Sequence, residues 1–211
     1  MEFLKYTLIT DGSSDRTLLN IIKWLLDDLY PQLPCDGSFA DFRRIPNPPQ
    51  IGDIADRINY AQRFYPFDIL FYHRDGEKID VTTRKKEIQK RIDPIMFSKI
   101  VCVIPVRMME TWLLINTDAI KKASGNRNYS GNIDLPVLKN LESLTNPKEK
   151  LHDLLKTTSG LKHRRLKTFN IHYAVHLVAE NIKDYSPLRE LPAFREFEND
   201  LKMAVDLFLM N

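Results

Sequence analysis

The chain has 211 residues, with 31 Lys and Arg against 28 Asp and Glu, and hydrophobic residues make up 43% of it. These values are ordinary for a globular domain, so they exclude a collagen, a continuous coiled coil and an intrinsically disordered chain. The net charge of +3 indicates nucleic-acid binding only if basic residues cluster locally. No apolar run approaches the length that spans a bilayer, so we expect no membrane protein.

The two cysteines, Cys35 and Cys102, lie far apart in the sequence and lack the spacing of a redox motif. The first five residues, Met-Glu-Phe-Leu-Lys, do not resemble the start of a secretion signal. We therefore expect reduced thiols and a cytoplasmic protein.

Strand-like and helix-like segments alternate over residues 1–125. Segments rich in β-branched and aromatic residues predict strong strands at 3–10, 67–73 and 99–106, and a short edge strand at 39–45. Apolar residues at helical spacing predict a helix at 18–30. Residues 51–64, the charged segment 80–92 and residues 108–125 are also predicted to be helical. This alternation predicts an α/β fold, with a mainly parallel sheet flanked by helices.

The last third of the chain has a different pattern. Residues 126–146 are polar and interrupted by Asn, Gly and Pro, which predicts a loop with at most one short helix. Further helices are predicted at 147–156, 170–184 and 190–210. We therefore divide the chain into an α/β core, residues 1–125, and a helical C-terminal extension, residues 126–211, packed on the core in one compact unit.

Acidic residues follow the ends of all three strong strands. Asp11 and Asp15 come after the first, Asp75 and Glu77 after the second, and Glu110 after the third. Parallel sheets bind ligands at the carboxyl ends of their strands. Carboxylates that gather there raise one another's pKa, and a divalent cation removes this repulsion. A set of oxygen ligands without Cys or His favours Mg²⁺ or Mn²⁺ over zinc.

Several of these acids also have a purely structural interpretation. Asp11-Gly12 and Asp75-Gly76-Glu77 are typical of turns. Asp15 is placed to complement the dipole at the start of the first helix. The strand before Asp75 has the pattern of a fully buried strand, which favours a functional role for the residues that follow it.

Glu110 is the most informative single acid. It precedes Leu113 and Leu114 by three and four positions, which places it on the apolar face of its predicted helix. A buried glutamate needs a partner, and either Arg107 or a metal ion satisfies that need. His73, next to the acidic pair, is either a core histidine or a hydrogen-bond donor that orients Asp75.

The densest basic cluster comprises Lys162, His163, Arg164, Arg165 and Lys167. Such side chains neutralise phosphate charge and release counterions when nucleic acid binds. The alternative interpretation is a solvated loop and helix start.

The acidic motifs resemble those of the Toprim family, whose domains occur in topoisomerases, primases and OLD nucleases. A strand ends in the acidic-Gly pair Asp11-Gly12, with Asp15 four residues after the acid, and a later strand ends in Asp75-x-Glu77. The family usually has Glu at the first position and Asp at the last. Segments 103–114 and 191–197 are similar to uncharacterised bacterial Toprim-like proteins associated with phage defence.

This resemblance implies that Asp11, Asp75 and Glu77 hold one Mg²⁺ (or Mn²⁺), and that Asp15 and Glu110 contribute to a second. Two such ions activate a water and stabilise the leaving oxygen of a phosphodiester. The implied function is a nuclease, with DNA expected ahead of RNA and an ATPase as partner, since the sequence has no ATP-binding motif of its own.

The sequence also has interpretations other than a nuclease. The main alternative is a non-catalytic Toprim-fold subunit of an ATPase-containing complex. Topoisomerases and primases need additional domains for which this length leaves little room. Receiver-like and dehalogenase-like folds place paired acids directly after the first strand, whereas Asp11 and Asp15 are four positions apart. The sequence leaves the oligomeric state open.

Overall fold

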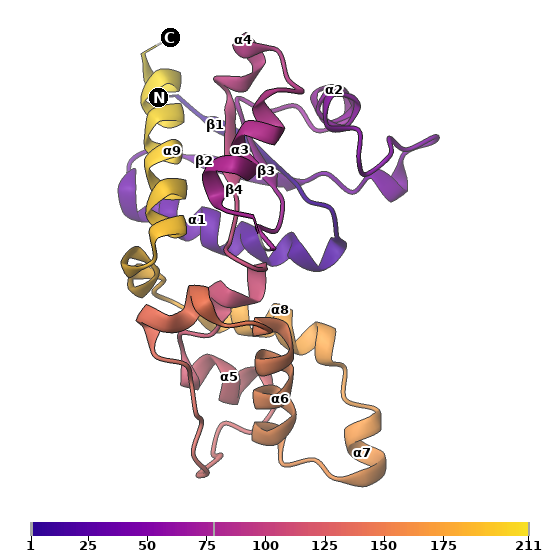
Figure 1. Ribbon diagram of the computed structural model, residues 1–211, viewed down its shortest axis with the longest axis vertical. Helices are drawn as coiled ribbons and strands as arrows, with labels where there is room; N and C mark the ends of the chain where they lie inside the picture. The colour runs from indigo at the N-terminus through magenta and orange to yellow at the C-terminus, as the bar shows by residue number, and fades with distance from the viewer. Residues whose placement is uncertain (1, 78, 211) are drawn as a thin grey trace.

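The computed structural model describes residues 2–77 and 79–210. In this part of the chain, a parallel sheet of four strands lies among helices (Figure 1), which confirms the predicted α/β class. The strands are β1 (Leu4–Ile9), β2 (Cys35–Phe39), β3 (Ile69–His73) and β4 (Ile100–Val103), in the order β2-β1-β3-β4. None of the helices in residues 2–77 and 79–210 is long and apolar enough to cross a membrane.

The strand sequences explain their places in the sheet. Every residue of β3 and β4 is buried, as expected for central or covered strands whose sequences are continuous apolar runs. The edge strand β2, Cys-Asp-Gly-Ser-Phe, alternates between half-buried and exposed residues. The prediction of an edge strand at 39–45 was wrong in position, because β2 begins at Cys35 and includes Gly37, a residue that is usually unfavourable in a strand. At Gly37, the Tyr6 side chain fills the space that a Cβ would need.

Two pairs of helices cover the two faces of the sheet. Residues of α1 (Leu18–Leu29) and α9 (Pro192–Leu209) share one hydrophobic cluster with one face. Residues of α2 (Ile54–Phe64) and α3 (Val81–Gln89) share a second cluster with the other face. The short α4 (Pro94–Phe97) precedes β4.

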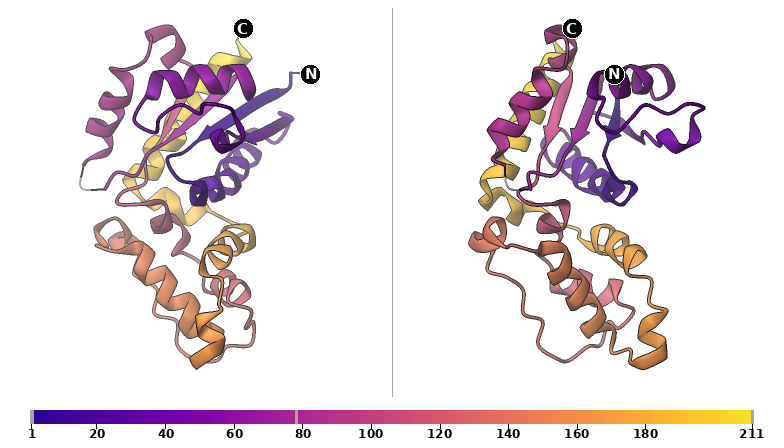
Figure 2. Two further views of the ribbon diagram at one scale, coloured as in Figure 1. Left: turned by 90° about the vertical axis from the view of Figure 1, so that its right-hand side faces the viewer. Right: turned by 45° about the vertical axis from the view of Figure 1, so that its right-hand side comes forward.

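The remaining helices form a separate lobe at one end of the molecule (Figures 1 and 2). We call it the helical lobe; it consists of α5 (Thr117–Ala123), α6 (Pro147–Ser159), α7 (His163–Lys167) and α8 (Ile171–Asn181). Helix α5 packs on α6 and α8, and α8 also contacts α1. The chain therefore enters the lobe before residue 125 and returns to the sheet in α9, so the lobe does not coincide with residues 126–211.

Short 3-10 helices occupy several connections, at η1 (Ser13–Thr17), η2 (Phe42–Arg44), η3 (Met109–Leu113), η4 (Leu138–Ser143) and η5 (Ser186–Glu190). The single helix predicted at 108–125 is two elements, η3 and α5. They are separate because the Asn116 side chain caps α5, accepting a hydrogen bond from the Ala119 amide at 2.8 Å. Helix α7 was missed, because a single turn of basic residues gives no apolar period.

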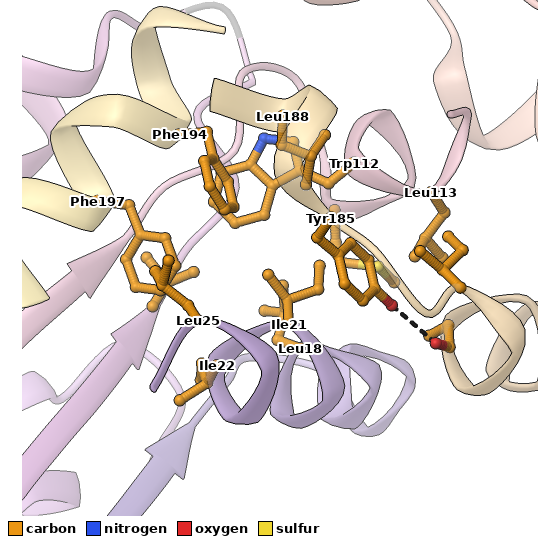
Figure 3. Packing of buried hydrophobic residues seen from close by; sticks show 14 of the residues in the cluster. Leu18, Ile21, Ile22, Leu25, Trp112, Leu113, Tyr185, Leu188, Phe194 and Phe197 are labelled. Carbon is orange, nitrogen blue, oxygen red and sulfur yellow. Dashed lines mark hydrogen bonds between the residues drawn. The ribbon is translucent and has the colours of Figure 1, made fainter. Parts of the chain in front are cut away.

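The core fixes η3 against the sheet. Figure 3 shows the Trp112 ring beside Phe194 and Phe197 of α9. Its centroid lies 5.2 Å from that of Phe194 and 5.7 Å from that of Phe197. The Tyr185 hydroxyl, in the same cluster, donates to the Ala179 carbonyl at 2.7 Å. Packing of this density leaves η3 little freedom, and η3 carries Glu110.

Candidate acidic site at the carboxyl edge of the sheet

The loops that follow β1, β3 and β4 meet at the carboxyl edge of the sheet. The chain runs from β1 to β2 on one side and later to β3 on the other, so the strand order reverses between β1 and β3. Ligands of parallel α/β sheets bind at such a reversal. The loops after β3 and β4 are joined there, since the Gly76 amide donates to the Pro105 carbonyl at 3.0 Å. A Cβ on Gly76 would lie 3.0 Å from that same oxygen, so glycine allows this approach.

His73, the last residue of β3, lies between two of the predicted acids. Its Nδ1 donates to the Val103 carbonyl at 2.9 Å, which leaves Nε2 directed at carboxylates. Nε2 lies 3.5 Å from Asp75 Oδ1 and 3.8 Å from Asp15 Oδ2. Burial by itself disfavours the imidazolium, but the hydrogen bond to Asp75 and the charge of Asp15 outweigh it and raise the pKa of His73. His73 is therefore both a buried residue and a polar partner of Asp75.

The carboxylates of Asp75 and Asp15 also accept hydrogen bonds from backbone amides. Asp75 Oδ1 accepts a hydrogen bond from the Met109 amide at 3.1 Å, at the start of η3. Asp15 Oδ2 accepts one from the Gly12 amide at 3.3 Å, and Asp15 Oδ1 accepts one from Ser14 Oγ at 3.1 Å. Each carboxylate thus faces the start of a 3-10 helix, where amide hydrogens point outward.

Glu110 is the most deeply buried of the acids, with 7% of its side chain exposed. The cation that approaches it is Lys148 of α6, whose Nζ lies 3.9 Å from Oε1, rather than the predicted Arg107. Burial raises the pKa of Glu110, and the negative charges of Asp75 and Asp15 raise it further. Asp15, Asp75 and Glu110 therefore act on one another electrostatically, and we call these three residues the acidic site.

Asp11 has a different environment. Its Oδ1 lies 2.7 Å from Arg57 Nη1, and its Oδ2 lies 3.3 Å from Arg74 Nε. Arg57 is almost wholly buried and also donates to the Thr10 carbonyl. Two guanidinium groups thus compensate the charge that Asp11 was predicted to offer a metal ion.

Glu77 also lies apart from the acidic site. Its side chain is 73% exposed, and its nearest cation is Arg84, whose Nη2 lies 3.8 Å away. Within residues 2–77 and 79–210, no group of three or more His, Cys, Asp or Glu side chains is placed to hold a metal ion. The trio that the resemblance implied, Asp11, Asp75 and Glu77, is therefore not assembled as a ligand set in the described residues, because Asp11 is bound by arginines and Glu77 faces solvent.

Sequence reasoning missed three basic residues near these acids: Arg57, Arg74 and Lys148. A signal existed for Arg57, since it falls among the buried residues Ile54, Ile58 and Ala61 of α2, where an arginine needs a partner. Lys148 gave no such signal, because it approaches Glu110 from a helix that begins 37 positions later.

The predicted basic cluster lies away from the acidic site. Lys162, Arg164, Arg165 and Lys167 are exposed, on or next to α7, at the far end of the helical lobe from the sheet (Figure 1). Closer to Glu110, a cavity of about 340 Å³ has a mixed lining of Met108, Asn146, Lys148, Glu149, His152, Asp153 and Lys156. Basic side chains thus lie both beside the acidic site and at the tip of the lobe.

Together, the fold and the site define an α/β protein with acidic residues at the reversal of its parallel sheet. No family model, curated protein or solved structure matches the chain.

Proposed function

We propose that this chain is a divalent-metal-dependent phosphodiester hydrolase that acts on nucleic acid, with DNA expected ahead of RNA. The observation that carries the proposal is the acidic site. Its buried Glu110 is acted on by the charges of Asp75 and Asp15, and the cation within ion-pair distance of Glu110 in the described residues is Lys148, at 3.9 Å. Carboxylates gathered at the reversal of a parallel sheet raise one another's pKa, and a bound divalent cation would relieve that repulsion. A Toprim-type enzyme is the specific form suggested by the sequence motifs.

The acidic residues differ in how well they fit such a cation. Asp11 and Glu77 do not fit, since one is bound by two arginines and the other faces solvent. Asp15, Asp75 and Glu110 fit by the chemistry of their oxygen donors, which Mg²⁺ and Mn²⁺ prefer. We therefore assign the cation to these three residues, which are not placed as a ready ligand set in residues 2–77 and 79–210 and would have to move closer together to bind it. When bound, it would supply an activated water and positive charge for the departing oxygen.

Other residues of the chain have supporting roles in this proposal. His73 holds Asp75 through Nε2, while its Nδ1 is fixed by the Val103 carbonyl. Arg74 lies at the carboxyl edge with 29% of its side chain exposed, so its guanidinium is placed to approach a phosphate oxygen. The basic side chains of α6 and α7 would neutralise phosphates further along the strand.

The second candidate is a non-catalytic interaction subunit of an ATPase-containing complex. It is favoured by the pairing of Asp11 with Arg57 and Arg74, and by the lack of a ready ligand set in residues 2–77 and 79–210. In that case the acids at the carboxyl edge would serve to join the loops after β1, β3 and β4, as the bond from the Met109 amide to Asp75 does.

A cleavage assay separates the two candidates. Purified protein is incubated with single-stranded DNA, duplex DNA and RNA in Mg²⁺ or Mn²⁺, alongside the Asp75→Asn and Glu110→Gln variants. Both substitutions keep the side-chain shape, and the asparagine of the first variant retains an oxygen that can accept the Met109 hydrogen bond. We expect cleavage by the wild type and a loss on the order of 100-fold in each variant, since each removes charge from the reacting centre.

The matched control is Asp134→Asn, which changes an acid that is 84% exposed and paired only with Lys150 among the described ion pairs. Its activity should equal that of the wild type. A wild type that cleaves none of the three substrates with either metal would favour the interaction subunit. Equal cleavage by Asp75→Asn and wild type would contradict the assigned site.

A further inference from the structure

A cavity of about 250 Å³ opens on the side of Asp11 that faces β2. Thr10, Asp11 and Gly12 line it after β1, and residues 39–43 line it after β2. Its outer wall comes from the proline-rich segment after η2, with Pro48, Pro49 and Ile51, and from Arg57 of α2. Asp11 therefore lies at the cavity, and Asp15 of the acidic site follows it four residues later in the chain.

The walls of this cavity are mostly flat and apolar. Phe39 and Phe42 lie on the β2 side, and the guanidinium carbon of Arg57 lies 5.1 Å from the centre of the Phe42 ring. Ile51, which also lines the cavity, is 62% exposed, although it is a large hydrophobic residue. Ile51 thus adds an exposed apolar group to a lining that also includes Phe39, Phe42, Pro48 and Pro49.

The charged groups of the lining largely cancel. Asp41 accepts a hydrogen bond from Arg43 Nε at 2.7 Å, and Asp11 is paired with Arg57. The Nε of Arg57 has no hydrogen-bond partner in the described part of the chain, but it is itself buried. A ligand that suits these walls is flat, has little net charge where it is enclosed, and offers polar atoms at its edge.

We propose that this cavity binds a nucleobase. Bases stack on aromatic rings and on guanidinium planes, and Phe39, Phe42 and Arg57 of the lining supply both. The volume is below the range of about 300–1,000 Å³ that is usual for pockets of drug-sized ligands, so it suits a single ring system. The base belongs either to a nucleic-acid strand or to a free nucleotide. This inference extends the proposed function. It rests on that function in one respect, because it expects the phosphate of the bound strand to lie at the acidic site.

Binding is tested in EDTA, so that no cleavage takes place. The probe is a fluorescein-labelled single-stranded DNA of six nucleotides, compared by fluorescence anisotropy with strands of the same sequence in which one position at a time lacks its base. We expect one abasic position to weaken binding about tenfold or more, because stacking of a base on aromatic residues contributes that much. The Ile51→Asp variant should abolish the difference between the complete and the abasic strand.

The matched control is Ile95→Asp, which changes another exposed isoleucine, 79% exposed, in α4 and outside this cavity. It should keep the full difference between the two strands. In a separate NMR experiment, the wild type is titrated with adenosine 5′-monophosphate and with the strand, and the signals of Ile51 and of the Phe39 and Phe42 rings are followed. If these NMR signals shift with both the mononucleotide and the strand, the ligand is a free nucleotide. If they shift with the strand alone, the ligand is a base within a strand.

Equal binding of complete and abasic strands, with no shift of the Ile51 signal by either ligand, would overturn the inference. So would an Ile51→Asp variant that still discriminates against the abasic strand. These outcomes are separate from those of the cleavage assay. Cleavage without base discrimination overturns only the nucleobase cavity, and base discrimination without cleavage overturns only the hydrolase.

Discussion

Asp11 and Asp75 occupy equivalent places in the fold but have different neighbours. Each lies two residues after a buried parallel strand, at the same edge of the sheet. Asp11 is paired with Arg57 and Arg74, whereas Asp75 meets a histidine and one backbone amide. The position after a strand therefore brings an acid to the edge, and the helix packed behind that strand decides whether its charge is already compensated.

The largest effect that we predict separates these two acids by stability. Asp11→Ala leaves the guanidinium of Arg57 buried, with only 4% of its side chain exposed, and without its carboxylate. Breaking a buried pair costs about 3–5 kcal/mol, and we expect about 2 kcal/mol here because Asp11 itself is partly exposed. Asp75→Ala should cost about 1 kcal/mol, because it removes the hydrogen bond from Met109 and the contact with His73 on a side chain that is 38% exposed. Urea unfolding of both variants measures the difference, and equal losses would contradict it.

Much of the fold could be predicted from the sequence, because its central strands and covering helices carry strong local patterns. The continuous apolar runs of β3 and β4 indicate strands buried on both faces. The edge strand was misplaced, since the role of Gly37 depends on Tyr6 of the neighbouring strand. Local sequence does not report such a contact.

The candidate site could be predicted only in part. The positions of Asp11, Asp15, Asp75 and Glu110 near the carboxyl edge follow from the strand ends, which the sequence indicates. Their partners do not, because Arg57 reaches Asp11 from 46 positions away and Lys148 reaches Glu110 from another helix. Burial and pairing depend on tertiary packing, so sequence alone assigned Asp11 and Glu77 the same role as Asp75.

A smaller effect is expected for Glu110→Gln, and it depends on pH. The pKa of Glu110 is raised in the folded state, so its contribution to stability is fully present below the unfolded pKa and is lost as the pH rises through the folded one. Glutamine should therefore stabilise the protein near pH 7, by less than about 1 kcal/mol. The gain should shrink towards about pH 4. The free energy of unfolding of both proteins, measured from pH 7 to about pH 4, tests this prediction. A stabilisation by glutamine that increases as the pH falls would contradict it.

The titration of His73 also distinguishes Asp75 from Asp11, and it can be measured in the folded protein. Its raised pKa depends on Asp75 and Asp15, so the pKa should fall in Asp75→Asn. Stability that protonated His73 contributes is fully present below its unfolded pKa and is lost as the pH rises through the folded one. Asp11→Asn, which changes the arginine-paired acid, should leave the titration unaltered. NMR of the imidazole protons measures the His73 pKa in the wild type and in both variants. An unchanged His73 pKa in Asp75→Asn would contradict the predicted interaction between the two residues.

The smallest effect is expected for Glu77→Gln. Because this side chain is 73% exposed, its replacement should change the free energy of unfolding by no more than about 0.5 kcal/mol. Cleavage should also fall much less than in Glu110→Gln, since Glu77 lies outside the acidic site. A loss in Glu77→Gln as large as that in Glu110→Gln would instead support the ligand set implied by the Toprim resemblance.

The most direct test of the central claim is a calorimetric titration of Mn²⁺ into the wild type and the Asp75→Asn, Glu110→Gln and Asp134→Asn variants. If Asp15, Asp75 and Glu110 hold a divalent cation, the wild type and Asp134→Asn will bind Mn²⁺ with the same affinity, and the other two variants will lose binding. A wild type that takes up no Mn²⁺, or acid variants that bind it as tightly as the wild type, would contradict the claim.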